Sequence, residues 1–473
     1  MNTEIFDVVV FGGGVIGACV FNALSKSGYK TALLEKATDV AVGASKANSG
    51  IVHGGFDAKP GTLKARFNVE GNKMYPEICE RLGLPLLKTG AYVIGNDIQV
   101  VQDLYNRGQQ NGVAGLKILN RRQLLKRIPN ITDNVTCGLF CDRSYIVSPY
   151  MFNICVAEEG VVNGGKVYLN FEAKTVKKEK GIYKITDGKQ TVGSKYVVNC
   201  AGAGYNDVAH LFGAEQYEIE FKRGEYYVLD TSEKNLVPTT IFPLPSKHTK
   251  GVLVTPTVDG NILVGPTSYE SDETTVTTQA GLNEIKEKSS SVINNVNFSK
   301  TIRIFSGVRT IVGDDFVVEK SKIVDGMVNV AGICSPGLTA SPAIAKYVVE
   351  LLGLKYAPET RNKKIKPYIK LSHLTDKEQD KMIKINPLYG KIVCRCERVS
   401  EGEIIDAINR PIRPTTIDGI KRRARAGMGR CQGGFCADKV ALLLAKHNHV
   451  PLESVVREYK DGRYVMGNIK EVE

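Results

Sequence analysis

A spaced set of glycines near the N-terminus constrains the fold of this chain more than any other feature. Gly12, Gly14 and Gly17 follow an apolar run that starts at Ile5, and they lead into a helix expected over residues 15–27. The first glycine permits a tight turn, the second lets the backbone approach a diphosphate, and the third lets helix and strand pack closely. Free N–H groups at the helix start attract phosphates. We therefore expect this segment to hold a dinucleotide.

An acidic residue and a polar loop extend the predicted cofactor site. Glu35 follows a second strand, residues 31–34, at the spacing expected for an acid that binds ribose hydroxyls. These features alone do not choose between FAD and NAD. The glycine-rich stretch 43–55 favours FAD, because a small polar loop can lie against a large flat ring and donate main-chain N–H groups to it. The loop residues expected to contact the cofactor are Ser45, Asn48, Ser49 and Gly50.

Two later segments match the same kind of site. One follows a strand expected over 195–201, and the other follows a strand expected over 327–331. Their expected cofactor contacts are Ala201, Gly202, Gly332, Gly337, Leu338 and Thr339. Together with the glycines and the polar loop, these segments resemble the D-amino-acid oxidase-like superfamily of FAD enzymes over roughly residues 1–355. The resemblance implies an extended FAD, an antiparallel sheet above the flavin ring, and backbone dipoles from 331–339 that stabilise the reduced flavin.

Four of the eleven cysteines form a pattern of their own near the C-terminus. Cys394 and Cys396 are followed, after 34 intervening residues, by Cys431 and Cys436. The other cysteines are scattered, which argues against a disulfide framework and for a reducing compartment. Two close pairs of thiolates indicate a metal site. A one-residue gap is unusual for structural zinc, and a four-residue gap with two glycines suits a loop over a [2Fe–2S] cluster; zinc and no metal are the alternatives.

The residues around these cysteines add to the cluster prediction. The spacing and the stretch 425–433 resemble the bacterioferritin-associated-ferredoxin-like domain, which also closes the catalytic subunit of anaerobic glycerol-3-phosphate dehydrogenases. The basic run 421–425, with Arg430, either raises the reduction potential of the anionic cluster or forms an ordinary solvated helix face. A flavin takes two electrons and a cluster passes one at a time. We therefore expect a dehydrogenase with an electron-accepting protein subunit as partner, rather than an oxidase.

The predicted fold class follows from these units. It is an α/β FAD-binding Rossmann-like domain with an antiparallel-sheet substrate domain, followed by a small helical [2Fe–2S] domain. Segments rich in β-branched residues and Tyr, between about 217 and 311, indicate the antiparallel sheet. The expected boundaries are an oxidoreductase over 1–355 (FAD-binding part about 1–85, 145–215 and 320–355; substrate part about 86–144 and 216–319), a linker over 356–390, the [2Fe–2S] domain over 391–446 and a tail over 447–473.

Composition limits the class of protein and its partners. The 473 residues are 42% hydrophobic and 24% charged, as in a globular protein of more than one domain. Because no run of 18 apolar residues and no secretory signal is found, we expect a cytoplasmic protein, with peripheral association at the inner face of a membrane left open. The formal net charge of +13 fits either an anionic partner or a lysine-rich surface, and no nucleic-acid-binding motif accompanies it.

The residues after His53 bear on the substrate. Glycerol-3-phosphate dehydrogenases of this superfamily carry Arg-Tyr where this chain has Asp57 and Ala58, and they carry a Lys near the flavin that is missing from 332–339. Each lost charge-assisted contact is worth about 1.5–3 kcal/mol. The stretches 53–65 and 223–227 instead resemble the L-2-hydroxyglutarate dehydrogenase family. We expect a small 2-hydroxy acid as substrate, with the polyol phosphate glycerol 3-phosphate as the alternative. An amino-acid dehydrogenase or oxidase and a non-catalytic electron-transfer subunit are further alternatives.

Three side chains are candidates for the chemistry. His53 is the expected base for the hydroxyl proton, with His248 as second choice, and the flavin takes the α-hydrogen as hydride. Arg309 is the expected cation for the substrate carboxylate, because a guanidinium forks onto a carboxylate. The structural alternatives are a histidine that only lines the cofactor loop and an arginine in a domain-interface ion pair.

Overall fold

The first lobe is built on a largely parallel sheet. The computed structural model describes residues 3–245 and 251–467. Across the sheet the strands run β18 (Val317–Lys320), β19 (Met327–Ala331), β11 (Thr191–Asn199), β1 (Glu4–Phe11), β2 (Thr31–Leu34) and β8 (Lys166–Tyr168), with β10 (Ile182–Thr186) and β9 (Thr175–Glu179) beside β11. β1 pairs in parallel with both β2 and β11. Its apolar residues are buried because helices cover both faces of the sheet.

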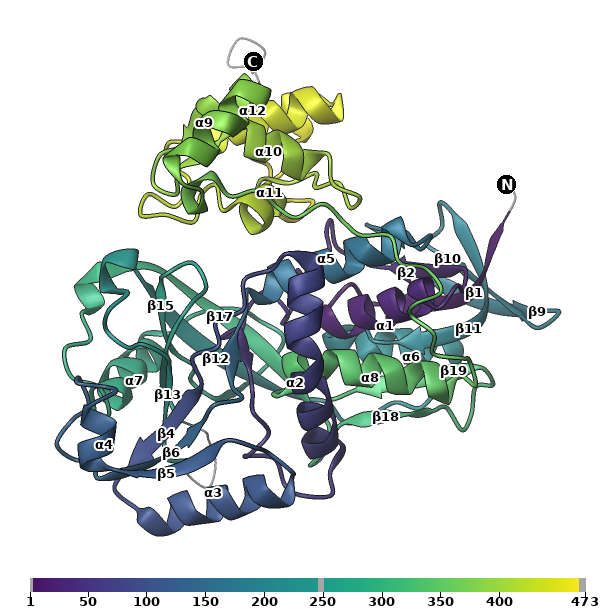
Figure 1. Ribbon diagram of the computed structural model, residues 1–473. Helices are drawn as coiled ribbons and strands as arrows, with labels where there is room; N and C mark the ends of the chain where they lie inside the picture. The colour runs from purple at the N-terminus through teal and green to yellow at the C-terminus, as the bar shows by residue number, and fades with distance from the viewer. Residues whose placement is uncertain (1–2, 246–250, 468–473) are drawn as a thin grey trace.

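Helices from distant parts of the chain pack on this sheet (Figure 1). They are α1 (Val15–Lys26), α2 (Leu63–Leu82), α5 (Pro149–Val162), α6 (Tyr205–Phe212) and α8 (Gly337–Leu351). α1 packs between α5 and α8, and α2 packs on α8. α6 covers the opposite face, where Tyr205 and Ala209 are fully buried. A short ribbon of β3 (Ile51–Val52) and β7 (Tyr145–Ile146) joins the polar loop to the start of α5.

A second sheet forms the other lobe. Its order is β16 (Tyr269–Ser271), β12 (Glu220–Leu229), β15 (Ile262–Gly265), β14 (Leu253–Pro256), β13 (Thr240–Pro243), β4 (Ala91–Gly95), β6 (Cys137–Cys141) and β5 (Leu116–Asn120), with β17 (Thr301–Ile311) also on β12. All pairs are antiparallel except β13 with β4. Outside the sheet lie α3 (Ile98–Gln110), α4 (Arg121–Leu125) and α7 (Gln279–Ser290).

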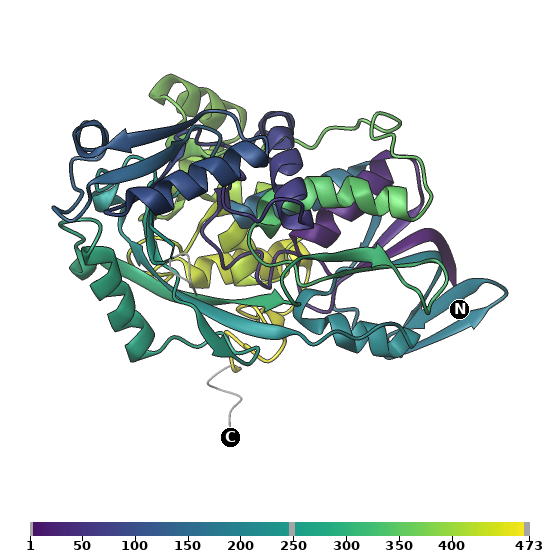
Figure 2. The same ribbon diagram turned by 90° about the horizontal axis from the view of Figure 1, so that it is seen from below.

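The C-terminal unit is small and mostly helical. It contains β20 (Ile392–Cys394), β21 (Val399–Ser400), α10 (Glu401–Ile408), α11 (Ile417–Ala424) and α12 (Ala437–Asn448), preceded by α9 (Asp376–Ile385). Ile404, Ile420 and Leu444 are fully buried in its own core. In Figure 1 the unit lies above the two lobes with α11 on the side of the body, and in Figure 2, seen from below, the two lobes lie in front of it. Single turns of 3₁₀ helix are η1 (Gly202–Gly204), η2 (Thr231–Glu233), η3 (Phe298–Lys300), η4 (Leu371–His373), η5 (Pro387–Gly390) and η6 (Leu452–Ser454).

The predicted fold class is confirmed, with local differences. The strand expected over 195–201 begins four residues earlier, at Thr191, where β10 and β1 already pair with it. The last helix of the first lobe begins at Gly337 rather than near 341. The connecting stretch 356–390 is more than an extended linker, since it contains α9, which begins with a capping box at Thr375 and Glu378. Over the described residues, no helix is both long and apolar enough to cross a membrane.

Candidate active site and metal centre

The turn between β1 and α1 forms a cradle for a phosphate group. Gly12 has φ +96°, and a Cβ there would lie 2.5 Å from the carbonyl oxygen of Cys200. A Cβ on Gly17 would lie 1.9 Å from the oxygen of Gly12, so α1 packs directly on the turn. Gly14 meets only Ser45 Oγ, at 3.3 Å. The N-terminus of α1 has no side-chain cap from Gly14 and no acidic residue in its first turn, which leaves its positive potential for an anion.

Side chains next to this turn are already oriented. Glu35 Oε2 accepts the N–H of Gly13 at 2.6 Å, and Oε1 accepts the N–H of Ala37 at 2.8 Å. Burial raises the pKa of this carboxyl. Each of its oxygens keeps a second lone pair that a ribose hydroxyl could use. Ser45 Oγ accepts the N–H of Val15 at 2.8 Å, in the first turn of α1. These groups fit the diphosphate and ribose of a dinucleotide.

His53 lies where two of the predicted cofactor segments, 43–55 and 331–339, meet α2. Its N–H donates to Thr339 Oγ1 at 2.9 Å, and its carbonyl oxygen accepts the side-chain amides of Asn68 (2.8 Å) and Asn72 (3.0 Å). Its Nε2 lies 3.4 Å from Ser335 Oγ. The main chain of His53 is therefore held at both polar groups, and its ring points toward the loop before α8. Ser335 and the two asparagines were not singled out from sequence, because only the fold brings α2 to this loop.

The polar loop 44–50 is held by hydrogen bonds within the loop, and it contacts the second sheet. Asn48 donates to the carbonyl oxygens of Ala44 and Ser45 and accepts the N–H of Gly50 at 2.9 Å. A Cβ on Gly307 of β17 would lie 2.2 Å from the oxygen of Ala47. The second sheet therefore closes over the loop at this point.

The remaining cofactor segments lie at the ends of β11 and β19. Ala201 lies two residues after the end of β11, and its N–H donates to Asn199 Oδ1 at 3.2 Å. Leu338 accepts the Tyr75 hydroxyl at 2.5 Å through its carbonyl oxygen. Thr339 is fully buried in the first turn of α8. Gly202 (φ +59°), Gly332 (φ +65°) and Gly337 complete the predicted set around the same sheet edge.

Arg309 lies on β17 beside an aromatic stack. Its Nη2 donates to the carbonyl oxygen of Thr267 at 2.8 Å, which fixes the plane of the guanidinium. Tyr226 stacks on Phe305 with ring centroids 4.7 Å apart, and its hydroxyl lies 3.2 Å from Ser49 Oγ. Burial raises the pKa of Tyr226, and the nearby positive charge of Arg309 opposes that shift. Tyr226 therefore interacts both with Ser49 of the cofactor loop and with the charge of Arg309. His248 lies outside the described residues.

The four C-terminal cysteines pair across the motif rather than within it. Cys396 Sγ and Cys431 Sγ are 3.7 Å apart. Cys394 and Cys436 form the other pair, and their hydrogen bond lowers the pKa of Cys394 to about 6 while raising that of Cys436. Two thiolates bound tetrahedrally to one metal at about 2.3 Å lie about 3.8 Å apart. Two such pairs fit the two irons of a [2Fe–2S] cluster. Among the described residues, no group of three or more His, Cys, Asp or Glu is placed around a single ion.

The basic run of α11 is not a solvated helix face. Lys421, Arg422 and Arg423 are buried. Arg423 binds both carboxylate oxygens of Asp39 at 2.6 and 2.9 Å, and Arg422 binds Asp39 at 3.1 Å. Burial alone would raise the pKa of Asp39, but the two guanidinium groups hold it below its usual range. The interpretation of 421–423 as a solvated face is therefore wrong, because these residues anchor the C-terminal unit to the segment after Glu35.

Further ion pairs join the C-terminal unit to the two lobes. Arg425 bridges Glu397 of the cysteine loop and Asp259 of the second lobe, at 2.7 and 2.8 Å. Arg430 forks onto Asp230 at 2.7 and 2.9 Å. The tail also returns to the body, as Glu458 binds Lys46 and Arg422.

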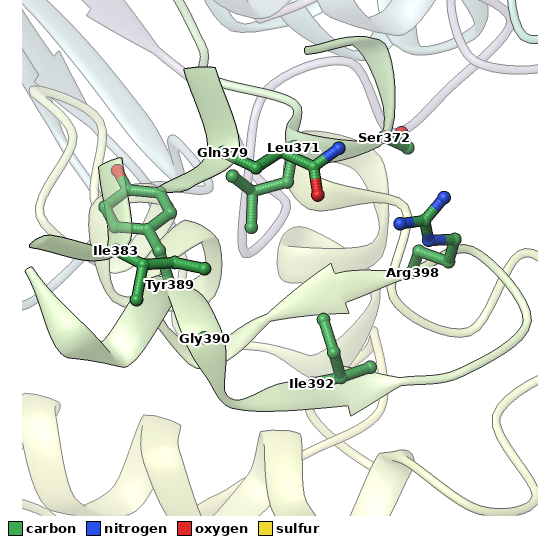
Figure 3. Close-up of a pocket in the computed structure, with 8 residues that line it drawn as sticks. All are labelled: Leu371, Ser372, Gln379, Ile383, Tyr389, Gly390, Ile392 and Arg398. Carbon is green, nitrogen blue, oxygen red and sulfur yellow. The ribbon is translucent and has the colours of Figure 1, made fainter. Parts of the chain in front are cut away.

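A separate cavity of about 220 Å³ lies in the C-terminal region, lined by Leu371, Ser372, Gln379, Ile383, Tyr389, Gly390, Ile392 and Arg398 (Figure 3). Its lining shares no residue with either predicted site.

Comparison with known families identifies both parts of the molecule. Residues 7–351 match the family described as FAD dependent oxidoreductase, and residues 392–446 match the BFD-like [2Fe-2S] binding domain. The chain belongs to the FAD dependent oxidoreductase family. Its cofactors are therefore FAD and a [2Fe–2S] cluster, which the cradle at Gly12–Gly14 and the paired cysteines fit.

Relatives within this family differ in how much of the chain they share. The glycerol 3-phosphate dehydrogenase of Caloramator mitchellensis is 40% identical over 98% of both chains. The glycerol 3-phosphate oxidase of Mycoplasma genitalium is 32% identical over 74% of this chain and 96% of its own. Human mitochondrial L-2-hydroxyglutarate dehydrogenase is 30% identical over 56% of this chain and 61% of its own. A solved structure, dithionite-reduced L-alpha-glycerophosphate oxidase from Mycoplasma pneumoniae with FAD bound, superposes with a TM-score of 0.74 at 29% identity, covering 78% of this chain and all of that one. The chain is thus an FAD-dependent oxidoreductase of the class whose members act on CH–OH donors.

Proposed function

We propose that this flavoprotein oxidises glycerol 3-phosphate to the corresponding keto phosphate and passes the electrons to its [2Fe–2S] cluster. The observation that carries the proposal is the 40% identity to a glycerol 3-phosphate dehydrogenase over 98% of both chains, which includes the cysteine domain. The 2-hydroxy acid expected from the residues after His53 has weaker support. The L-2-hydroxyglutarate dehydrogenases resemble this chain at 30% identity over 56% of its length.

His53 is the proposed base. Its fixed main chain and the Ser335 hydroxyl 3.4 Å from Nε2 orient the ring, so the imidazole can take the proton of the substrate hydroxyl. FAD, when bound, supplies the acceptor for the hydride that leaves the same carbon. Removal of the hydroxyl proton raises the electron density on the carbinol carbon and favours hydride departure. Ser335 then acts as a positioning residue for the base.

Arg309 is the proposed anchor for the substrate's anionic end. One arm of its guanidinium is held by Thr267, and a phosphate offers the paired acceptor oxygens that the guanidinium fork matches. The same cation would hold a carboxylate, which is why the hydroxy-acid alternative uses the same residue. The missing Arg and Lys of other glycerol-3-phosphate dehydrogenases at 57 and 332–339 leave Arg309 as the cation that this proposal depends on.

The cofactor contacts predicted from sequence enter the proposal unchanged. Gly12, Gly14 and Gly17 would hold the diphosphate, Glu35 would bind the ribose, and the polar loop and the stretch 331–339 would contact the ring. We keep the division into a two-part oxidoreductase over 1–355 and a [2Fe–2S] domain over 391–446. A separate protein subunit is the proposed electron acceptor, and the cytoplasm, with peripheral membrane association left open, is the proposed location.

Anaerobic reduction of the flavin by a panel of substrates tests the proposal. Glycerol 3-phosphate should remove the flavin's visible absorbance, and the cluster should then show the electron paramagnetic resonance signal of its reduced state. L-2-Hydroxyglutarate, lactate and amino acids should act far more slowly. Rapid bleaching by L-2-hydroxyglutarate, with none by glycerol 3-phosphate, would overturn the substrate and restore the hydroxy-acid alternative.

A further inference from the structure

The crossed pairing of the cysteines makes the two irons of the cluster unequal. Cys396 is exposed and Cys431 half-buried, whereas Cys394 and Cys436 are both buried. The outer pair, Cys396 and Cys431, therefore holds an iron near the surface of the C-terminal unit. The inner pair, Cys394 and Cys436, holds an iron against the apolar core of that unit.

The loop that carries the outer pair faces the flavoprotein body. Gly429 packs on Cys396, because a Cβ there would lie 2.3 Å from the Cβ of Cys396. Gln432 donates to the carbonyl oxygens of Met428 (3.1 Å) and Gly429 (3.0 Å), and its own Oε1 accepts Arg303 of β17 at 3.0 Å. The neighbouring Arg430 is bound to the body through Asp230. The loop is thus clamped to the second lobe on both sides of Cys431.

Tyr150 joins this loop to the flavin side of the body. Its hydroxyl donates to Met428 Sδ at 3.5 Å, and the residue lies in the first turn of α5. The residues just before it pack on the cofactor loop: the N–H of Val147 donates to Gly50 at 2.8 Å, and a Cβ on Gly50 would lie 3.3 Å from Pro149. One short stretch of chain therefore contacts the cofactor loop at one end and the cysteine loop at the other.

The local chemistry also favours the outer pair as the reducible side. The sulfur of Cys431 accepts main-chain N–H groups of Gly433, Gly434 and Phe435, and the inner Cys394 also accepts those of Gly427 and Glu397, so exposure is the feature that separates the two pairs. Hydrogen bonds to the sulfurs and exposure to water both stabilise the extra negative charge of a reduced cluster. The guanidinium of Arg430 interacts electrostatically with Cys396, with Asp230 as its ion-pair partner. The buried inner pair lacks that exposure, since it faces the apolar core.

We propose that the iron held by Cys396 and Cys431 receives the flavin's electrons, and that Tyr150 and Met428 are the bridge through which they arrive. Hydride transfer breaks a substrate C–H bond and leaves two electrons on the flavin. The cluster takes one, which converts the outer ferric iron to ferrous iron, and gives it to a one-electron acceptor outside before it takes the second. The hydroxyl proton and the flavin proton go to water, so charge and atoms balance. The inference rests on the proposed function only for the order of electron flow.

Light-driven reduction of the flavin in the holoenzyme tests the bridge without any substrate. A sacrificial donor reduces the flavin during a short anaerobic flash, and the absorbance of flavin and cluster is followed afterwards. Tyr150→Phe removes the hydrogen bond, and Met428→Leu removes the sulfur at similar volume. In the double variant we expect the flavin-to-cluster transfer rate to fall about tenfold. Tyr368→Phe is the matched control, because Tyr368 also contacts α5, through Glu158, but not the cysteine loop.

An unchanged transfer rate in the double variant, or an equal loss in the control, would overturn the bridge. Because the flash replaces the substrate, a wrong substrate assignment leaves this result untouched. Mössbauer spectra of the reduced, ⁵⁷Fe-enriched protein test the iron. Cys396→Ser should alter the ferrous site and Cys394→Ser the ferric site, and the reverse pattern would overturn the assignment. If a serine variant binds no cluster, the transfer rates of the Tyr150 and Met428 variants decide whether the proposal stands.

Discussion

The cofactor turn near the N-terminus and the basic stretch of α11 both bind charge, but they find their partners at very different distances along the chain. Gly12, Gly14 and Gly17 create their site within a few residues, through main-chain geometry and one helix end. Arg422 and Arg423 instead reach Asp39, more than 380 residues away in sequence. Local geometry leaves a signature in the sequence, whereas a buried long-range ion pair looks the same as a solvated basic helix until the fold is known.

A bulky side chain in the turn gives the largest expected effect. Gly17→Val places atoms where a Cβ alone would already lie 1.9 Å from the Gly12 oxygen, so α1 must move off the turn. We expect purified protein without flavin but with its cluster, measured as the ratio of each cofactor to protein. Gly390→Ala is the control, since it lies outside the FAD-binding lobe and a Cβ there comes no closer than 3.4 Å to another residue, and it should keep its flavin. Flavin retained in the Gly17 variant would contradict the cradle.

Removal of one buried guanidinium tests the other side of the comparison. Arg423→Met leaves Asp39 buried with only Arg422 beside it, and we expect a loss of about 3 kcal/mol in the free energy of unfolding, measured with denaturant. The exposed Lys446→Met should change little. The double variant Asp39→Asn, Arg423→Met should recover part of the loss, because the stranded charge is gone. A loss below about 0.5 kcal/mol in the single variant would mean that this face is as tolerant as an ordinary surface.

The proposed base gives a large kinetic effect with no loss of cofactor. His53→Gln should keep its flavin while reduction of that flavin by substrate slows about a hundredfold. The exposed His210→Gln on α6 is the control. Anaerobic stopped-flow traces measure the step directly. Equal rates in wild type and the His53 variant would remove His53 from the chemistry and leave it as a residue that lines the loop.

The smallest expected effect concerns the lysine at the start of the basic run. Burial lowers the pKa of Lys421 to about 8. The unfolded chain has a value of about 10.4. Below pH 8 the lysine is charged in both states, and burying that charge lowers the free energy of unfolding. This destabilisation decreases as the pH rises from 8 toward about 10.4, because the folded protein then holds the lysine neutral. Lys421→Met should therefore add about 1–2 kcal/mol of stability at pH 7 and progressively less above pH 8. The exposed Lys439→Met should show no such pH dependence.

Both cofactors were predictable because their sequence signals are local. The turn glycines, the element order β1–α1–β2 and the four cysteines can each be recognised within a short stretch of sequence. Ser335, Asn68 and Asn72 escaped notice because α2 and the loop before α8 meet only in the folded sheet. The pairing of the cysteines also depends on the fold, since sequence proximity suggests Cys394 with Cys396, whereas the chain brings Cys396 to Cys431.

The substrate is the part on which the short sequence motifs and the whole-length similarity point in different directions. The residues after His53 favoured a hydroxy acid, whereas the more similar whole-length relative is a glycerol 3-phosphate dehydrogenase. A single anion-binding arginine serves a carboxylate and a phosphate equally well in charge and geometry. The short motifs therefore could not separate the two substrates, and the arrangement of both domains along one chain carried the decision.

The crossed cysteine pairs have a consequence for how the protein is made. In the proposed arrangement each iron joins a residue from the stretch 394–396 to one from the stretch 431–436 before the last long helix, so neither half of the motif completes a pair by itself. The cluster can be inserted only after the ribosome has released Cys436, when the flavin lobe has long been synthesised. A cell short of iron would therefore accumulate chains that bind FAD but lack the [2Fe–2S] cluster.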